Sequence, residues 1–263
     1  MDDLVQRLKA HGLTQVLHNV PAGDWAGGER GIAILPGRAD EFKAGVEKAI
    51  AYATALDCKQ VNCIAGIAPA GIARPVLEET FIANLRFAAG RLKQAGIKLL
   101  IEAINPIDIP GFFLNTTAQA LDIIARTGSD NLFVQYDIYH MQITEGELAC
   151  TMERNISMIP HIQLDDNPGR HEPGTGESNY PFLFAHLDRI GYSGWSGPKT
   201  GPGPPPKPAL AGSRQLARRR AERTARTPVW RAIMAGHLCW TQATRWSAPS
   251  SKPSPPLIFL PRG

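Results

Sequence analysis

The sequence predicts an α/β fold, a (β/α)8 barrel of which about five βα units are recognisable. Short apolar runs alternate with stretches of helical periodicity, and such runs are typical of parallel strands buried on both faces. The runs end in polar residues, at the position where barrel enzymes carry their active sites. No Gly-x-Gly-x-x-Gly motif opens a helix, which disfavours a doubly wound sheet, and no nucleotide cofactor is expected.

The expected elements follow one another as strand and helix. Strands are expected at residues 14–19, 60–64, 97–102, 132–137 and 161–164. Helices are expected at residues 2–11, 41–56, 75–95, 116–127, 146–157 and from 180 or 181 to 190. A closed barrel has eight strands and takes about 250 residues. The barrel is therefore expected to be incomplete at both ends.

Local signals support the helix boundaries. Pro75 is acceptable in the first turn of its helix, and Gly96 and Gly191 each close one. Thr116 or Thr117 caps the helix that follows it. The apolar faces of three helices are formed by Leu4, Val5 and Leu8, by Phe42, Val46, Ala49 and Ile50, and by Ala118, Ala120, Leu121 and Ile124.

Polar side chains at three strand ends form the candidate site. Glu102 lies in the apolar run of residues 97–105, where a carboxylate is costly unless it is paired, protonated or bound to a metal. Asp137 ends the next strand and His140 follows it. Gln163 lies in the last of these strands, and Arg170 comes in the polar loop after it. The oxygen donors of Glu102, Asp137 and Gln163 suit a hard divalent ion such as Mg²⁺ or Mn²⁺.

The charge is divided unevenly along the chain. The formal net charge is +4, but residues 197–263 contain twelve basic residues and one acidic residue. Residues 1–196 contain 16 basic and 23 acidic residues. Two parts of opposite sign predict an acidic partial barrel domain at 1–196 and a Pro/Arg-rich tail at 197–263, disordered or read out of frame. An acidic folded part is unfavourable for DNA, so no nucleic-acid partner is expected.

Cysteine spacing and hydropathy bear on location. The four cysteines follow neither a CxxC motif nor a disulfide-framework spacing, so they are interpreted as reduced and the protein as cytoplasmic. No apolar run approaches about 20 residues, so no membrane partner is expected.

Four motifs resemble the hydroxypyruvate isomerase family, which belongs to the xylose-isomerase-like TIM barrels. They are His18-Asn19 with Pro21-Ala-Gly-Asp-Trp25, Leu100-Ile-Glu-Ala-Ile-Asn105, Gln135-Tyr-Asp-Ile-Tyr-His-Met-Gln142, and residues 161–177 with Asn-Pro-Gly-Arg-His-Glu-Pro-Gly-Thr-Gly-Glu. The resemblance covers about residues 3–197. It implies a xylose-isomerase-like barrel and an aldose-ketose isomerase that interconverts hydroxypyruvate and 2-hydroxy-3-oxopropanoate (tartronate semialdehyde) through an enediolate.

The resemblance also assigns roles. Glu102 would be the catalytic base as well as a metal ligand with Asp137 and Gln163. His140 and Arg170 would bind the oxygens and carboxylate of a small 2-oxo acid substrate, and His18 is a third substrate-binding candidate.

The chain departs from the family pattern at both ends. Family members have about two further strands and a helix ahead of residue 1. Gly194-Trp195-Ser196-Gly197 resembles the start of their last strand, but Lys199 stands where a second catalytic Glu and fourth metal ligand is expected. We therefore expect an internal start joined to a frame-shifted C-terminus.

Several alternatives remain open at this point. Gln163 is also compatible with a core amide, Arg170 with a solvated loop charge and His18 with an ordinary histidine. Alternative functions are an isomerase of four-carbon 2-oxo acid sugars, an inactive fragment and, less favoured, a metal-dependent DNA-repair endonuclease. A homo-oligomer is compatible with the sequence.

Overall fold

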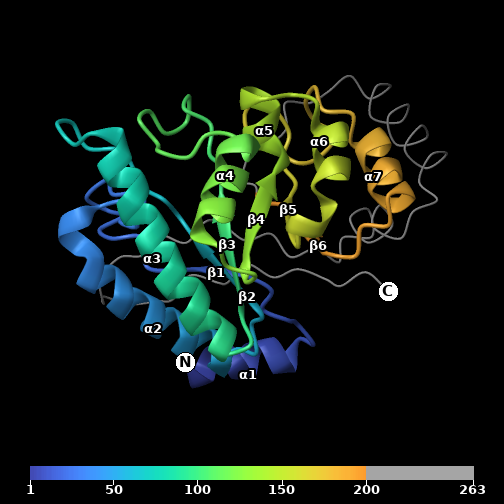
Figure 1. Cartoon of the computed structure of the whole chain (residues 1–263). Coiled ribbons are helices and arrows are strands. Elements are labelled where there is room, and N and C mark those ends of the chain that lie inside the picture. The colour runs from blue at the N-terminus through green and yellow to red at the C-terminus, as the bar shows by residue number, and fades with distance from the viewer. Residues whose placement is uncertain (200–263) are drawn as a thin grey trace.

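The computed structural model of the protein describes residues 1–199. Six parallel strands form a single curved sheet in the order β1-β2-β3-β4-β5-β6 (Figure 1). The strands are β1 (His18–Asn19), β2 (Gln60–Cys63), β3 (Lys98–Glu102), β4 (Leu132–Asp137), β5 (His161–Gln163) and β6 (Trp195–Gly197). Each strand pairs with the next in the sequence, as in a βα barrel, but six strands are fewer than the eight that close one. The expected incomplete barrel is confirmed for the described residues.

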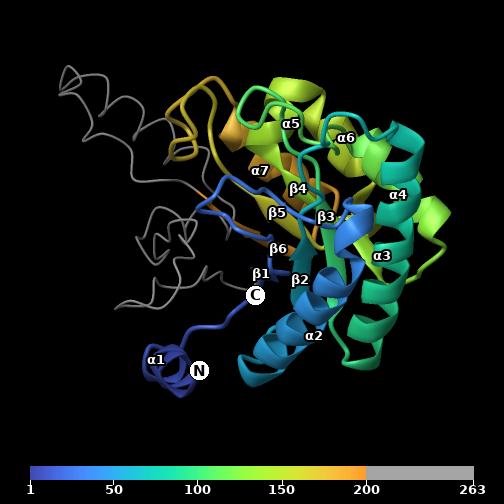
Figure 2. The ribbon, with the colours of Figure 1, turned by 90° about the vertical axis from the view of Figure 1, so that its left-hand side faces the viewer.

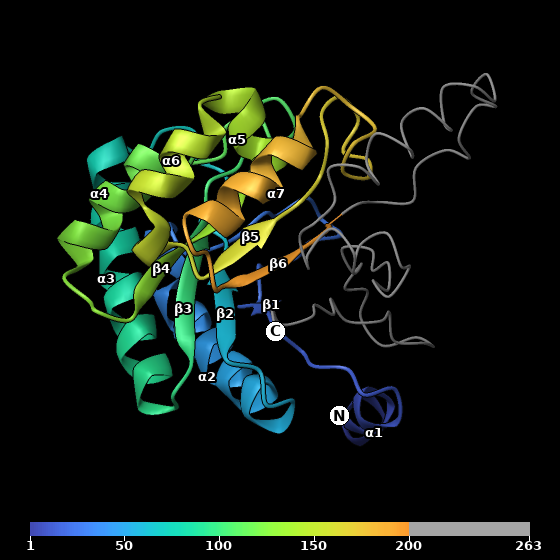
Figure 3. The same cartoon turned by 90° about the vertical axis from the view of Figure 1, so that its right-hand side faces the viewer.

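Helices cover one face of this sheet (Figures 1 and 3). They are α2 (Ala39–Ala55), α3 (Arg74–Gln94), α4 (Thr117–Thr127), α5 (Ile138–Thr144), α6 (Leu148–Arg154) and α7 (Tyr180–Arg189), with short 3-10 helices at Pro36–Arg38 and Ile156–Met158. The first helix of the chain is α1 (Asp2–Ala10). Helix α2 contacts β1 and β2, α3 contacts β3, and α4 contacts β4. Helix α1 stands apart from the other helices, beyond an extended segment (Figures 2 and 3).

The strand register divides the sheet into an apolar face and a polar face. Side chains alternate between the two faces of a strand, and residues paired in register share a face. The helix-covered face carries core residues that include Val61, Cys63, Leu99, Ile101, Val134, Tyr136 and Ile162. The opposite face, which we call the inner face, carries Asn62, Glu102, Gln135, Asp137, His161 and Gln163. The polar residues are therefore gathered on one side by register alone.

The predicted elements agree with the observed ones to within a few residues, with four differences, of which the first is strand β6, which was not among the strands expected. The strand expected at 14–19 is reduced to His18–Asn19. The helix expected at 146–157 begins only at Leu148, because Gly146 and Glu147 both adopt left-handed backbone conformations that no α-helix continues through. Helix α5 was not predicted, and it follows β4 with no loop between them.

The backbone after β1 crosses the backbone after β2 at very short range, at Gly31 and Gly66. Gly31 has a φ of 115°, and a Cβ atom there would lie 2.4 Å from the carbonyl oxygen of Ile64. Gly66 has a φ of 123°, and its Cβ would lie 2.5 Å from the carbonyl oxygen of Gly31. Only glycine fits such a close approach at positive φ. The crossing holds the long loop after β1 against the end of β2.

Three expectations from the sequence concern the remaining features. The tail expected at 197–263 lies outside the described residues from residue 200 onward. Cys58, Cys63 and Cys150 are free thiols, in line with the expectation of reduced cysteines. Within residues 1–199, no helix combines the length and the apolar character that crossing a membrane requires.

Candidate active site

The candidate site lies on the inner face at the carboxyl ends of β3 to β6. Glu102 ends β3, Asp137 ends β4, Gln163 ends β5, and Lys199 follows β6 by two residues. Glu102 is fully buried, and Asp137 and Gln163 are each 1% exposed. Buried carboxylates must be compensated by cations or hydrogen-bond donors, and the neighbouring side chains supply both.

The two carboxylate oxygens of Glu102 have different partners. Oε1 accepts a hydrogen bond from Lys199 Nζ at 2.7 Å, and the two groups form an ion pair. Oε2 accepts from Asn62 Nδ2 at 3.1 Å, and the same amide nitrogen lies 3.2 Å from Asn19 Oδ1. The buried charge is thus matched by a cation that lies 97 residues further along the chain.

Asp137 combines a structural and an electrostatic role. Its Oδ1 accepts from the backbone N–H groups of Tyr139 at 3.0 Å and His140 at 3.4 Å, which caps α5. Its Oδ2 accepts from Arg170 Nη2 at 2.9 Å. Burial raises the pKa of Asp137, but the nearby His140, Arg170 and Lys199 outweigh it and lower the pKa to about 2. Asp137 is therefore a permanent carboxylate at neutral pH.

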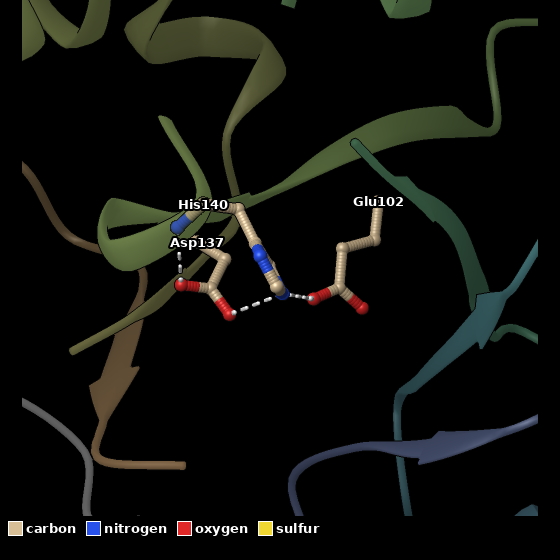
Figure 4. Close-up of side chains that lie close together, drawn as sticks. All are labelled: Glu102, Asp137 and His140. Carbon is tan, nitrogen blue, oxygen red and sulfur yellow. Dashed lines mark hydrogen bonds and ion pairs between the residues drawn. The ribbon is translucent and has the colours of Figure 1, made fainter. Parts of the chain in front are cut away.

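His140 lies between the two carboxylates (Figure 4). Its Nε2 is 3.6 Å from Asp137 Oδ2 and 3.9 Å from Glu102 Oε1. Its Nδ1 is 2.7 Å from Asn105 Nδ2 and 3.4 Å from the backbone nitrogen of Asn105. Two donors at Nδ1 assign the proton to Nε2, so the ring donates toward the carboxylates. Burial lowers the pKa of His140, which keeps the ring neutral.

The loop after β5 brings Arg170 to the site. Arg170 has a left-handed backbone with a φ of 57°, and its guanidinium lies over the ring of Tyr139 at 5.0 Å. The carboxylate of Asp166 holds this loop by accepting four backbone hydrogen bonds, from Asn167, Gly174, Gly176 and Ser178. Arg170 is therefore positioned by its loop, and it is not the solvated charge that one alternative envisaged.

Sequence reasoning missed Asp165. Its Oδ2 accepts from Arg170 Nε at 3.2 Å, and its Oδ1 accepts from the backbone N–H of Lys199 at 2.9 Å. Burial, followed by the charge of Asp137, raises the pKa of Asp165 to about 7. The two-residue alternation from Gln163 carries the inner face to position 165, so the pattern already contained this signal. Asn62 was missed in the same way, as a polar residue in a short apolar strand.

The structure brings most of the predicted site residues together. Glu102, Asp137 and His140 converge, and Arg170 contacts Asp137. Gln163 pairs in register with Asp137 and shares its face. The Oε1 atom of Gln163 is buried without a hydrogen-bond partner, so this amide is not the satisfied core amide that the sequence left open. Lys199 lies against Glu102, at the position where a carboxylate was expected.

The placement of His18 corrects one prediction. His18 pairs in register with Val61, whose side chain belongs to the helix-covered core, so His18 lies on the opposite face from Glu102. Its Nδ1 is 3.2 Å from the carbonyl oxygen of Asn19, and its ring also lies near the backbone of Ala49 in α2. The residue of β1 that reaches the inner face is Asn19. The prediction was wrong by one residue because a single step along a strand reverses the side-chain direction.

The donor set fits a metal ion in its chemistry but not in its charge. Among residues 1–199, one ligand atom each from Glu102, Asp137 and His140 lie within 4.8 Å of one another, and oxygen and imidazole donors suit a divalent cation. However, Lys199 already contacts Glu102 Oε1, and Arg170 already contacts Asp137 Oδ2. A divalent ion would therefore have to enter beside two cations.

The fold and the sequence both have well-defined relatives. The sequence profile of the family described as xylose isomerase-like TIM barrel matches residues 1–219. The chain is 51% identical over 197 residues to hydroxypyruvate isomerase of Escherichia coli, covering 75% of this chain and 76% of that protein. It is 45% identical over 195 residues to 2-oxo-tetronate isomerase of Cupriavidus necator, covering 74% and 75%.

A solved structure agrees with this relationship. A protein described as AP endonuclease, family 2 from Brucella melitensis matches with a TM-score of 0.75 and 43% identity, over 77% of this chain and 78% of that one. The match and the identities extend over most of the described residues. The chain therefore belongs to the xylose isomerase-like TIM barrel family.

Proposed function

We propose that this protein is an aldose-ketose isomerase that interconverts hydroxypyruvate and 2-hydroxy-3-oxopropanoate through an enediolate. The proposal is supported by curated relatives that are themselves isomerases of small 2-oxo acids. The observation that carries it is a buried carboxylate, Glu102, that pairs with Lys199 and lies beside His140, while Arg170 binds the neighbouring Asp137. A base beside several donors is what proton transfer next to a carbonyl requires.

The reaction moves one proton between adjacent carbons. Glu102 Oε1 removes a proton from C3 of hydroxypyruvate, the C2 carbonyl becomes an enediolate oxygen, and the same carboxyl group returns the proton to C2. As the aldehyde forms, the proton of the C3 hydroxyl passes to the C2 oxygen, which becomes the hydroxyl group of the product. The His140 Nε2–H and the ammonium group of Lys199 face this region and stabilise the oxygens on which negative charge develops.

Arg170 is the group for the substrate's carboxylate. A guanidinium presents several donors in a fixed fork and binds carboxylates in a bidentate manner. In the structure it contacts two carboxylates, Asp137 through Nη2 and Asp165 through Nε. The remaining donors of the fork are available to a third. Asp137 and Asp165 orient the guanidinium, and the permanent charge of Asp137 keeps it at the site.

The test is a coupled assay of hydroxypyruvate isomerisation on the full chain, its Glu102→Gln variant and its Glu79→Gln variant. Glu79 is an exposed residue of α3 and is not one of the site residues. Loss of a general base costs about 10²- to 10⁴-fold in rate. We expect such a loss for Glu102→Gln and none for Glu79→Gln. Equal turnover by all three chains would refute the role of Glu102, and no turnover by the unsubstituted chain would refute the function.

The four-carbon substrate is the second candidate, because the relative from Cupriavidus necator is a 2-oxo-tetronate isomerase. The same assay with 2-oxo-tetronate separates the two. The higher identity to hydroxypyruvate isomerase leads us to expect the larger kcat/KM for hydroxypyruvate. A larger kcat/KM for 2-oxo-tetronate would assign the four-carbon reaction instead.

The name of one related structure favours the endonuclease alternative, whereas the charge of residues 1–196 disfavours it. The Brucella melitensis structure carries an endonuclease description, but residues 1–196 here contain 23 acidic and 16 basic residues. Proteins that bind DNA neutralise its phosphates with Lys and Arg. The Mg²⁺ or Mn²⁺ site that the sequence predicts at Glu102, Asp137 and Gln163 is a separate question of binding, because no step of the proposed reaction passes through an ion. The cytoplasmic location and a homo-oligomer stay predictions.

A further inference from the structure

We infer that the ammonium group of Lys199 takes the place of a divalent cation in this site, so that the chain carries the positive charge itself and excludes a metal ion. The exclusion of a metal ion rests on the contacts of Lys199 and on the charges around it. Only the effect of Lys199 on the reaction rests on the proposed isomerisation.

Lys199 is held at the site by its backbone as well as its side chain. Strand β6 pairs with β5 so that Gly197 lies opposite Gln163, and the N–H of Leu164 donates to the carbonyl oxygen of Gly197 at 2.9 Å. The N–H of Lys199 donates to Asp165 Oδ1 at 2.9 Å. The Lys199 side chain is 16% exposed, and its ammonium group reaches the fully buried carboxylate of Glu102. A side chain anchored in this way is not a surface lysine that happens to point inward.

The candidate carboxylate ligands are already paired without a metal ion. Glu102 pairs with Lys199, and Arg170 pairs with both Asp137 and Asp165. A divalent ion among these groups would bring two further positive charges next to Lys199 and Arg170 in a buried position, where charge that is not paired is costly. To bind Glu102 Oε1 it would first have to displace the ammonium group of Lys199 at 2.7 Å.

The side-chain amide of Gln163 provides a further oxygen at the site. Gln163 Oε1 is buried and has no hydrogen-bond partner, and it lies on the same face as Asp137. A neutral oxygen of this kind is a weaker ligand for a hard cation than a carboxylate. The described residues thus provide the geometry of a cation site whose charged ligands are already neutralised.

The test is Mn²⁺ binding to the EDTA-treated full chain, followed by the electron paramagnetic resonance signal of free Mn²⁺. Lys199→Glu replaces the cation by a ligand, and Lys199→Met removes the charge without adding a ligand. Reversing one charge near an ion is worth at least about tenfold in affinity. We expect Lys199→Glu to bind one Mn²⁺ per chain at least about tenfold more tightly than the unsubstituted chain, with Lys199→Met in between.

Two results would overturn the inference. The first is one Mn²⁺ per chain bound by the unsubstituted protein as tightly as by Lys199→Glu, with that binding weakened by Glu102→Gln. The second is no Mn²⁺ binding by either Lys199 variant. Far-UV circular dichroism identifies the variants that fold, and if Lys199→Glu does not, Lys199→Met decides. Tighter Mn²⁺ binding by Lys199→Met than by the unsubstituted chain supports the inference, and no gain overturns it.

Activity measurements provide a test that is independent of Mn²⁺ binding. If the chain isomerises either 2-oxo acid, its rate should be unchanged by EDTA, whereas Lys199→Met should lose activity that added Mn²⁺ does not restore fully. A chain without isomerase activity refutes the proposed function and leaves the Mn²⁺ result to be judged alone. An active chain that EDTA inactivates refutes the replacement of the metal and leaves the function standing.

Discussion

Glu102 and Asp137, two of the buried acidic residues of the site, differ in their hydrogen-bond partners. Glu102 has one cation, Lys199, and one amide, that of Asn62. Asp137 has the guanidinium of Arg170 and two backbone N–H groups at the start of α5. Charge-assisted hydrogen bonds of this kind are worth more than neutral ones and fix geometry. The base is thus the less constrained of the two carboxylates, as proton transfer requires.

Histidine burial predicts a pH dependence of stability. Burial lowers the pKa of His18, so the native state favours the neutral ring. As the pH falls below the ordinary histidine pKa of about 6.5, the unfolded chain takes up a proton that the native chain does not. Stability is therefore present above that pH and lost below it, with a slope of at most about 1.4 kcal/mol per pH unit for one proton.

Urea unfolding at pH 7.5 and pH 5.5 checks this expectation. His18→Gln should lose less stability between the two pH values than the unsubstituted chain. The fall should be reduced but not abolished, because burial also lowers the pKa values of His140 and His161. The control is His11→Gln, at an exposed position. An equal fall in His18→Gln and the unsubstituted chain would contradict the burial argument.

Single site residues could be predicted where their polarity differed clearly from that of their neighbours in the sequence. Glu102 was found because a carboxylate in an apolar run is conspicuous, and Asp137 because it ends such a run. His18 was misplaced because a short strand gives little pattern from which to fix the side-chain direction. The contact between Lys199 and Glu102 could not be predicted, since it joins residues 97 positions apart through the pairing of four strands.

Helix termini are the elements whose sequence signals were most informative. Thr116 forms a capping box with Gln119: the Thr116 hydroxyl accepts from the Gln119 N–H, and the Gln119 side chain accepts from the Thr116 N–H. The helix ends at Gly128 in a left-handed conformation. Helix α5 has no separate cap in the sequence, because Asp137 serves both strand and helix, and for that reason it was overlooked.

The capping box of α4 yields a prediction about stability. Thr116→Ala removes the side-chain acceptor and should lower the free energy of unfolding by about 1 kcal/mol. Thr116→Ser retains a hydroxyl and should remain close to the unsubstituted chain. Chemical denaturation of the three chains measures the difference. A Thr116→Ser variant as unstable as Thr116→Ala would show that the methyl group, and not the hydrogen bond, matters here.

At the scale of the whole molecule, the two faces of the sheet have different roles. The helix-covered face supplies the apolar core, and the inner face supplies the chemistry. The alternation of side chains predicted this division in outline. The incomplete barrel and five of the six described strands also followed from the sequence, because each of the five forms a separate apolar run, whereas β6 was not among the strands expected. The curvature that brings Lys199 to Glu102 depends on pairing between distant segments, which local patterns do not encode.

The buried ring of Phe81 in α3 should contribute strongly to global stability. Phe81 is fully buried, and its ring meets that of Phe113 edge to face at 6.0 Å. Phe81→Ala should lower the free energy of unfolding by about 3 to 5 kcal/mol, since it leaves a cavity. Phe81→Leu retains most of the volume and should cost less than about 1.5 kcal/mol. Equal losses in the two variants, measured by denaturant unfolding, would argue that ring geometry outweighs volume.

The amide of Asn62 has a stereochemical consequence. Because it holds Oε2 of Glu102 while Lys199 holds Oε1, the carboxylate is fixed in one orientation and delivers hydrogen to the flat intermediate from one side. Carbon 2 of 2-hydroxy-3-oxopropanoate is chiral, so delivery from one side creates one enantiomer. In the forward direction, the same constraint selects one of the two mirror-related hydrogens on the hydroxymethyl group of hydroxypyruvate.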